Sequence, residues 1–371
     1  MKKNSPITIA HIHVWDKNNK GDVAIVLAVQ ELLRQKFLSC KILDFPVETL
    51  KSGTETDLQK INSADFVIIG GGGIFYSYFL PYCIDFIRRI TKPIIIFGAG
   101  YIKEVGAPEL SSAARVSLVE LIKAATLVGV RDYKTKEFLE SHGAPLRKIK
   151  VIGDPAVLLI EKKPARFKIS PRTKKIASKQ LPIRLGLNLN YSGWLGFGEW
   201  REDILNSYRA VADYFIDEYS KTGEEKATSR STKPGLEIYY LKHHPGEDNI
   251  YPELKIKDLK VVDLKAAEQK YIYGQMDLVI GMMLHAGVLA FGAGTPEISV
   301  AYDLRNYSFA EFIKCPELVI DLNKLKNGEL LKRVKQVFTK RQKYVNIFRH
   351  KKAEIYKKQN EFLDRVKKSV Y

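Results

Sequence analysis

Residues 66–73 are Phe66-Val67-Ile68-Ile69-Gly70-Gly71-Gly72-Gly73, an apolar run that ends in four glycines. A second apolar run, Pro93-Ile94-Ile95-Ile96-Phe97, comes after a helical pattern and also ends at a glycine, Gly98. Neither run alternates apolar with polar residues, which is typical of strands that are buried on both faces. The two runs therefore predict a parallel sheet that is covered by helices on both sides.

The alternation of strands and helices extends over most of the chain. In the first half, we expect strands at 7–12, 41–44, 66–69, 94–97 and 126–130, and helices at 23–37, 81–90, 113–125 and 133–141. After residue 180 we expect strands at 183–188, 236–241, 261–264, 278–280 and 297–301, and helices at 202–219, 266–275 and 286–291. This order predicts an α/β fold with two Rossmann-like domains.

The length of 371 residues also favours two domains, because it exceeds what one hydrophobic core usually organises. We expect an N-terminal domain at 1–160, a basic linker at 161–180 and a C-terminal domain at 181–328. A basic helical segment follows at 329–371. Residues 221–235 are rich in Gly, Ser, Thr and charged residues, so we expect a mobile loop there.

The C-terminal segment is strongly basic. Residues 321–371 hold 16 Lys and Arg against 5 Asp and Glu, a net charge of +11 out of +18 for the whole chain. Its apolar residues recur at helical spacing, which predicts either a helix that packs back across the two domains or an amphipathic helix on an anionic membrane. We expect no nucleic-acid partner, since no recognition module accompanies the charge.

Cysteine and histidine usage argues against disulfides and metal sites. Cys40, Cys83 and Cys315 are far apart, and none belongs to a CxxC pair. His11 and His13 alternate on the first predicted strand, and we interpret them as core or edge residues, so no metal is expected. The sequence shows neither a signal peptide nor a run of about eighteen apolar residues. We expect a cytoplasmic protein, or one held peripherally at the inner face of the membrane.

Ligands of open parallel sheets bind beyond the carboxyl ends of the strands. Four predicted strands end in unusual residues: Gly70 to Gly73, Gly98-Ala99-Gly100, Arg131-Asp132 and Gly153-Asp154-Pro155. Free main-chain amides at glycine turns attract anions, although tight strand-to-helix packing explains such glycines equally well. Asp22, which precedes the first predicted helix, is interpreted either as a helix cap or as part of the site.

The segment from Gly281 to Pro296 carries the strongest signal for chemistry. There a strand ends, His285 stands at the start of an apolar helix, and a Gly-Thr-Pro turn leads to the next strand and to Tyr302-Asp303-Leu304-Arg305. We expect this segment to face a cleft between the two domains. An imidazole, whose ordinary pKa is near neutral, suits general acid or base catalysis there. The alternative is a histidine that caps the helix.

Together these pieces resemble the polysaccharide pyruvyltransferase family over most of the chain. The resemblance rests on the order and spacing of five motifs: Asn19-Lys20-Gly21-Asp22, Gly70 to Gly73, Arg131-Asp132, Gly153-Asp154-Pro155-Ala156, and Leu284-His285-Ala286 with the later Gly294-Thr295-Pro296 and Tyr302-Asp303. The resemblance implies a GT-B-like arrangement of the two domains. It also implies transfer of pyruvate from phosphoenolpyruvate to two hydroxyls of a sugar in a surface polysaccharide, such as a capsule or exopolysaccharide, or in its lipid-linked precursor.

The resemblance also assigns roles to residues. His285 is the expected acid. The expected donor-binding residues are Arg131, Arg305, Leu284, Met283, Gly72, Gly73 and Gly100. Asn19, Gly21, Asp22, His243 and His244 are expected to bind the acceptor or to be structural. Phosphoenolpyruvate would be a co-substrate, and no cofactor is expected.

Met283 departs from the family pattern, in which an arginine commonly precedes Leu-His. A thioether cannot pair with an anion. Either Arg305 and the neighbours Lys242, His243 and His244 supply the missing charge, or the donor is not phosphoenolpyruvate. Two other functions stay open. One is a nucleotide-sugar glycosyltransferase of the same fold, although no carboxylate lies on the helix between Ala286 and Ala293. The other is a catalytically silent glycan-binding relative.

Overall fold

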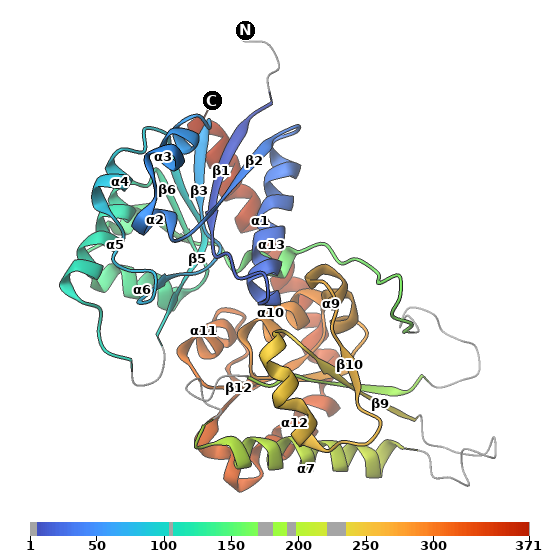
Figure 1. Ribbon diagram of the computed structural model, residues 1–371. Helices are drawn as coiled ribbons and strands as arrows, with labels where there is room; N and C mark the ends of the chain where they lie inside the picture. The colour runs from blue at the N-terminus through green and yellow to red at the C-terminus, as the bar shows by residue number, and fades with distance from the viewer. Residues whose placement is uncertain (1–5, 104–106, 170–180, 191–197, 221–234, 371) are drawn as a thin grey trace. The chain divides into compact units, whose positions relative to one another are not determined.

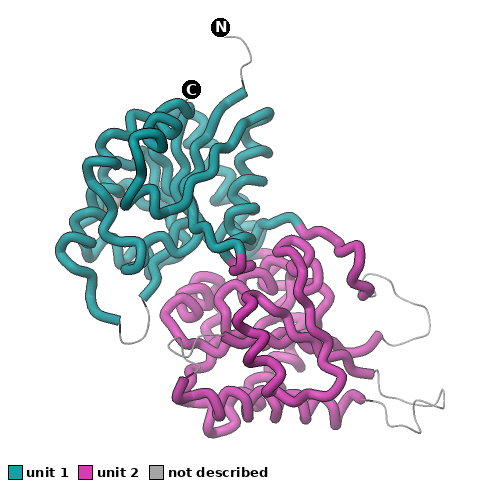
Figure 2. Tube along the Cα trace, viewed as in Figure 1, with its two compact units in different colours: residues 1–17, 22–160, 351–371 teal, residues 18–21, 161–350 magenta. Residues whose placement is uncertain are grey.

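The computed structural model of the protein describes residues 6–103, 107–169, 181–190, 198–220 and 235–370 (Figure 1). The chain divides into two compact units (Figure 2). Unit 1 contains residues 1–17, 22–160 and 351–371, and unit 2 contains residues 18–21 and 161–350. The expected mobile loop at 221–235 lies outside the described residues except for Gly235, as does the part of the expected linker beyond residue 169.

Unit 1 is built on a sheet in which all the described strand pairs are parallel, as the apolar runs predict. The strand order is β2-β1-β3-β5-β6-β7, and β4 pairs with β5 outside this path. The strands are β1 (Thr8–His13), β2 (Lys41–Pro46), β3 (Phe66–Ile69), β4 (Gly72–Tyr76), β5 (Ile94–Ile102), β6 (Leu127–Val130) and β7 (Ile149–Val151).

Helices cover both faces of this sheet (Figure 1). They are α1 (Lys20–Lys36), α2 (Thr49–Ser52), α3 (Glu55–Asn62), α4 (Ile84–Arg88), α5 (Ser112–Ala124) and α6 (Tyr133–Ser141), with short 3-10 turns η1 (Leu146–Lys148) and η2 (Pro155–Leu158). Ile94 and Ile96 of β5 join one core with α3 to α6, whereas Phe97 packs on Phe362 of the C-terminal helix, with ring centroids 5.8 Å apart. Both faces of β5 are therefore buried.

Unit 2 contains a second parallel sheet with the order β10-β9-β8-β11-β12-β13. The strands are β8 (Ile183–Leu187), β9 (Leu236–Leu241), β10 (Lys260–Val262), β11 (Leu278–Gly281), β12 (Glu297–Ala301) and β13 (Val319–Asp321). The helices are α7 (Arg201–Tyr219), α9 (Ala266–Tyr273), α10 (Leu284–Ala293), α11 (Leu304–Phe312) and α12 (Glu329–Thr339), with 3-10 turns η4 (Pro245–Asn249), η5 (Tyr251–Leu254), η6 (Pro316–Leu318) and η7 (Leu322–Asn327). Two parallel α/β sheets confirm the predicted pair of Rossmann-like domains.

The C-terminal helix α13 (Arg341–Val370) contributes to both units. Phe348 packs on Phe291 in unit 2, with ring centroids 4.7 Å apart, and Phe362 packs on Phe97 in unit 1. This confirms the predicted helix that packs back onto both domains, because its apolar stripe is buried. Among the described residues, the search for a helix long and apolar enough to cross a membrane finds none.

Three local predictions were wrong. The first helix begins at Lys20 instead of Val23, so Asp22 lies inside its first turn and does not cap it. The four glycines after β3 are not all turn residues, because Gly72 and Gly73 belong to β4. The helix expected at 81–90 is only Ile84–Arg88. The first two errors have one cause: glycine argues against regular structure in a sequence pattern, yet here tertiary contacts demand it.

Candidate functional site

The segment Gly281 to Pro296, which carries the strongest signal for chemistry, begins at the turn between β11 and α10. Asn188, directly after β8, holds this turn: its main-chain oxygen accepts from Met282 N at 3.2 Å, and its Oδ1 accepts from Met283 N at 3.1 Å. Helix α10 then begins at Leu284, and no side chain among the described residues caps it. Its first amides and the positive end of its dipole therefore stand at the carboxyl end of β11.

His285 lies in the first turn of α10 and directly against Gly21. A Cβ built on Gly21 would lie 2.2 Å from Nδ1 of His285 and 2.5 Å from its Cγ. No side chain fits there, because heavy atoms that are not bonded do not approach this closely. The imidazole of His285 therefore occupies the space that a side chain at Gly21, in the Asn-x-Gly-Asp motif, would need. His285 itself is 8% exposed.

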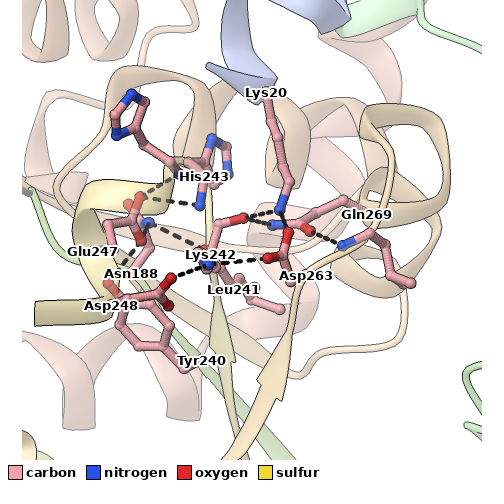
Figure 3. A network of polar contacts seen from close by, with 12 residues as sticks. Lys20, Asn188, Tyr240, Leu241, Lys242, His243, Glu247, Asp248, Asp263 and Gln269 are labelled. Atoms are coloured by element: carbon pink, nitrogen blue, oxygen red, sulfur yellow. Dashed lines mark hydrogen bonds and ion pairs between the residues drawn. The ribbon is translucent and has the colours of Figure 1, made fainter. Parts of the chain in front are cut away.

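Lys20 fixes the position of Gly21 (Figure 3). Its main-chain N donates to His243 O at 3.1 Å, and its Nζ donates to Lys242 O at 2.6 Å and to Asp263 Oδ1 at 2.5 Å. Burial lowers the pKa of Lys20, and the Asp263 carboxylate acts in the opposite direction. Asn19 completes the motif, since its Oδ1 accepts from Gly21 N at 2.9 Å.

A buried carboxylate, Glu247, organises the loop after β9 (Figure 3). Oε1 of Glu247 accepts from the main-chain N of His243 at 3.0 Å and of His244 at 2.8 Å. Oε2 accepts from the Tyr240 hydroxyl at 2.7 Å and from Asn188 Nδ2 at 3.2 Å. Burial raises the pKa of Glu247 to about 8, although the hydrogen bonds to it act in the opposite direction. Glu247 thus links the β9 loop to Asn188, the residue that holds the start of α10.

The predicted neighbours of the site in the β9 loop are held by the protein itself. His243 is fully buried, its Nε2 lies 2.7 Å from the Tyr273 hydroxyl, and burial lowers its pKa to about 3, with Lys20 acting in the same direction. His244 caps η4, because its Nδ1 accepts from Gly246 N at 3.0 Å. Lys242 Nζ pairs with Asp248 at 2.6 Å and with Asp263 at 3.0 Å. The positive charge of Lys242 is therefore offset, and His243 is neutral.

Arg305 and Met283 are brought together by Tyr302. The Tyr302 hydroxyl lies 3.3 Å from Arg305 Nη2 and 3.9 Å from Met283 Sδ. Arg305 also donates from Nε to Asp303 Oδ2 at 2.7 Å, while Oδ1 of Asp303 accepts from Arg305 N and caps α11. Arg305 is thus a guanidinium near Met283, oriented by a buried carboxylate.

In unit 1, Arg131 brings together two motifs and Gly100. Its Nε donates to Asp132 at 3.1 Å, and its Nη1 lies 3.7 Å from Asp154 Oδ2. A Cβ on Gly100 would lie 2.5 Å from Arg131 Cζ, so the missing side chain of Gly100 makes room for the guanidinium. Burial raises the pKa of Asp154, and Arg131 lowers it. Nη2 of Arg131 is buried and has no hydrogen-bond acceptor among the described residues.

Of the remaining candidates of unit 1, Gly72 lies beside Asp22 of α1, whereas Gly73 lies beside Ile102 of β5. Gly72 has a φ of +86°, which favours glycine, and its Cβ position lies 4.0 Å from Oδ1 of Asp22. A Cβ on Gly73 would lie 2.0 Å from Ile102 Cδ1, so Gly73 packs against a side chain. Arg131 belongs to unit 1 and Arg305 to unit 2, and their placement on two sides of one cleft stays a prediction.

The sequence analysis missed Lys20, Asn188, Glu247 and Asp263 as parts of the site. A glutamate three residues after the cap His244 is the spacing of a capping box, which could have singled out Glu247. Asn188 follows the apolar strand β8, where a polar residue at a carboxyl end is a candidate. Nothing in the sequence pairs Lys20 with Asp263, because 243 positions separate them.

A family model described as polysaccharide pyruvyl transferase matches residues 19–303. The chain belongs to the polysaccharide pyruvyl transferase family. The match begins at Asn19 and ends at Asp303, so it includes His285, Gly21 and the Arg131 cluster. Family membership identifies the chain as a transferase of polysaccharide biosynthesis.

Solved structures of similar fold support the architecture. Anabaena Alr3699/HepE in complex with UDP-glucose matches 98% of this chain and 100% of its own, with 13% identity and a TM-score of 0.55. The UDP-GlcNAc 2-epimerase of Neisseria meningitidis covers the same shares with 11% identity and a TM-score of 0.55. S. aureus MnaA with UDP covers 92% and 90%, at 11% identity and a TM-score of 0.55. At these identities the likeness extends to the GT-B-like fold alone. A comparison with curated proteins finds no match.

Proposed function

We propose that the protein transfers pyruvate from phosphoenolpyruvate to two hydroxyls of a sugar in a surface polysaccharide or its lipid-linked precursor. A proton adds to the methylene carbon of phosphoenolpyruvate, and the C2 carbon becomes oxocarbenium-like. One sugar hydroxyl attacks C2 and loses its proton. The second hydroxyl then forms its bond to C2 and loses its proton, while the C2–O bond breaks and phosphate leaves with the electron pair and takes up a proton. The products are a cyclic ketal and inorganic phosphate, and no cofactor is consumed.

His285 is the proposed acid, and its contact with Gly21 is the observation that carries the proposal. Two motifs of the family, 264 positions apart in the sequence, meet at that contact. The absence of a side chain at Gly21 makes room for the imidazole. The hydrogen bonds of Lys20 to the loop after β9 hold the chain beside it. A general acid must first lie within hydrogen-bond reach of the atom that it protonates, and only then does its pKa affect the rate.

The start of α10 is the proposed site for the anionic groups of the donor. Side chains cap α6, η2, η4 and α11, namely Asp132, Asp154, His244 and Asp303. The N-cap residue of α10, Met283, makes no side-chain cap hydrogen bond, as is also the case for α2, α4, α7, α9 and α12. Such an end attracts a phosphate or carboxylate. Leu284 would offer a main-chain contact there, and Arg305 beside Tyr302 would supply a cation. Met283, whose N already donates to Asn188, would contact the donor through its side chain.

Proposed donor-binding residues remain Arg131, Gly72, Gly73 and Gly100. For Arg131 this is supported by Nη2, which has no acceptor among the described residues. Two carboxylates beside Arg131 oppose the approach of an anion, so we assign it a weaker part than the start of α10. We propose structural roles for Asn19, Gly21, His243 and His244. Asn19 and Gly21 form the turn beside His285, and His243 and His244 belong to the loop that binds Lys20. For Asp22, near Gly72, we propose acceptor binding.

We further propose that the basic C-terminal helix holds the enzyme at an anionic membrane surface, where a lipid-linked acceptor would lie. The apolar stripe of α13 is buried, whereas Lys357, Arg365, Lys367 and Lys368 are exposed. Changing these four residues to Gln should reduce binding to vesicles of anionic lipid at low salt. Neutral vesicles are the control. Equal binding of the variant would contradict this part of the proposal.

The function is tested by incubating the purified protein with phosphoenolpyruvate and glycan acceptors. We expect release of phosphate and a gain of one pyruvyl mass on the acceptor. His285→Asn should abolish both and leave the unfolding temperature close to that of the unchanged protein. His350→Asn is the matched control, because His350 is an exposed histidine of α13. An active His285→Asn variant would remove His285 from its role.

A thermal-shift comparison separates the alternatives. A ligand that binds only the folded protein raises its stability, so phosphoenolpyruvate should raise the unfolding temperature more than UDP or GDP does. A shift with a nucleotide diphosphate alone, and consumption of its sugar conjugate, would instead establish a glycosyltransferase. Glycan binding without turnover of either donor would establish a catalytically silent relative.

A further inference from the structure

His11, His13 and Asp44 form a cluster of potential metal ligands in unit 1, apart from the residues assigned above. One ring nitrogen of each histidine and one carboxylate oxygen all lie within 4.8 Å of one another. The strand register explains this, because His11 stands opposite Asp44 in the neighbouring parallel strand and His13 follows two residues later on the same face. The sequence interpretation placed the two histidines in the core or at an edge and did not include Asp44.

Hydrogen bonds define which nitrogen of each histidine keeps its lone pair. His11 Nε2 lies 2.6 Å from Gly70 O, and His13 Nδ1 lies 2.7 Å from Val14 O. A carbonyl oxygen only accepts, so both of these nitrogens carry hydrogen. The lone pairs are therefore on His11 Nδ1 and His13 Nε2 when the rings are neutral. Histidines that bind a metal through one ring nitrogen usually donate a hydrogen bond from the other to a carbonyl or carboxylate oxygen.

Neither of these two nitrogens faces a hydrogen-bond donor among the described residues. Nδ1 of His11, a fully buried residue, has no hydrogen-bond partner among the described residues. Nε2 of His13 lies 3.2 Å from Oδ1 of Asp44, an oxygen that also accepts from Gln30. A cation between these atoms satisfies both.

The spacing of His13 and Asp44 suits a small transition-metal ion. Ligand atoms of a tetrahedral zinc site lie about 3.3 Å apart, since each is about 2.0 Å from the metal. The contact between His13 and Asp44 already has this spacing. Gln30 orients the carboxylate, because its Nε2 donates to Asp44 Oδ1 at 2.6 Å. The side chain of Asp44 is 39% exposed, which allows it to close on an ion.

His13 and Asp44 also line a pocket of about 180 Å³ that includes Trp15, Leu27 and Gln30. The Trp15 ring stacks on His13, with centroids 4.9 Å apart. An ion held by three protein ligands keeps one coordination position open, as in catalytic zinc sites. The pocket borders two of the three ligands, His13 and Asp44.

We propose that His11 Nδ1, His13 Nε2 and an Asp44 carboxylate oxygen bind one divalent transition-metal ion of the zinc class. Two imidazoles and one carboxylate form a ligand set that zinc prefers over magnesium or calcium, which favour oxygen ligands alone. The open coordination position then takes water or an oxygen of a pocket ligand. This proposal does not depend on the transferase reaction, because metal binding is measured directly.

The test is calorimetric titration of the full chain with zinc chloride at pH 7.5, after treatment with a chelator and desalting. We expect one equivalent to bind with a dissociation constant of about 1 μM or tighter. Asp44→Asn and His13→Ala should each weaken binding by at least about 100-fold, and Gln30→Ala by about tenfold. His350→Ala, which removes an exposed histidine outside the cluster, should leave binding unchanged.

Cobalt substitution supplies a second readout that does not depend on heat. Four-coordinate cobalt(II) should give visible absorption in the unchanged protein and none in Asp44→Asn, whose fold is checked by circular dichroism. If the unchanged protein binds no zinc at micromolar concentration, or if Asp44→Asn and His13→Ala bind it as well as His350→Ala does, the proposal is wrong. In that case the contact between His13 and Asp44 is an ion pair of a protonated imidazole.

Discussion

The imidazole of His285 occupies the space where a side chain at Gly21 would begin, since a Cβ there would come within 2.2 Å of Nδ1. Gly21 lies at the start of α1, and His285 lies in the first turn of α10. The contact explains why the motif around Gly21 has a glycine although its backbone does not take a positive φ. Steric space, not conformation, requires glycine here.

We therefore predict that Gly21→Ala displaces His285 and lowers turnover by about 100-fold, because misplacement of about 1 Å is sufficient for such a loss. The free energy of unfolding should fall by only about 1–3 kcal/mol. Phosphate release and thermal unfolding measure the two effects. The matched control is Gly274→Ala, where the nearest atom would be 3.4 Å away. Full activity of Gly21→Ala would show that the position of the ring is not critical.

The donor hypothesis makes a prediction about Met283, which stands where family members commonly have arginine. Met283→Arg should place a guanidinium beside the start of α10 and lower KM for phosphoenolpyruvate by about tenfold. Steady-state phosphate release gives KM and kcat separately. Met283→Leu, which conserves volume, should leave KM unchanged. An unchanged or higher KM in Met283→Arg would mean that no donor anion binds there.

Periodicity made the fold predictable, because buried parallel strands such as Phe66–Ile69 are continuous apolar runs whatever their neighbours are. Strand β4 escaped prediction because it begins with Gly72 and Gly73, which carry no strand signal and depend on pairing with β5. The motif singled out His285 as a candidate, and its catalytic role stays a prediction. The surroundings of His285 were not predictable, because Lys20, Asn188 and Glu247 meet through hydrogen bonds between distant segments, which no local pattern records.

Lys20 provides a test of whether these surroundings matter for catalysis. Lys20→Met removes the hydrogen bonds of Nζ to Lys242 O and to Asp263, and it leaves the Lys242 ammonium as the remaining partner of Asp263. We expect the free energy of unfolding to fall by about 1–2 kcal/mol, since Asp263 is half-exposed and partly screened. We also expect lower kcat, because Gly21 and His285 lose their anchor. Lys163→Met, at an exposed lysine, is the control for the loss of charge. Loss of stability with unchanged kcat would separate the network from the site.

Glu247 gives the last prediction, a dependence of stability on pH. Burial raises its pKa in the folded protein to about 8, whereas an unfolded chain has a glutamate pKa of about 4.3. The folded state therefore binds the proton more tightly. The contribution of protonated Glu247 to the free energy of unfolding is fully present below about pH 4.3 and is lost as the pH rises through about 8.

Urea unfolding at pH 5 and pH 8 gives the free energy of unfolding of the unchanged protein and of Glu247→Gln. The variant is the reference, because a glutamine has no proton to release. Relative to that variant, the unchanged protein should be more stable at pH 5 than at pH 8. Glu317→Gln, at an exposed glutamate, is the matched control and should show no such change. A difference that grows towards pH 8 would mean that the four donors around Glu247 hold it as a carboxylate. The fixed charge would then stabilise the β9 loop beside Asn188 and, through it, the start of α10.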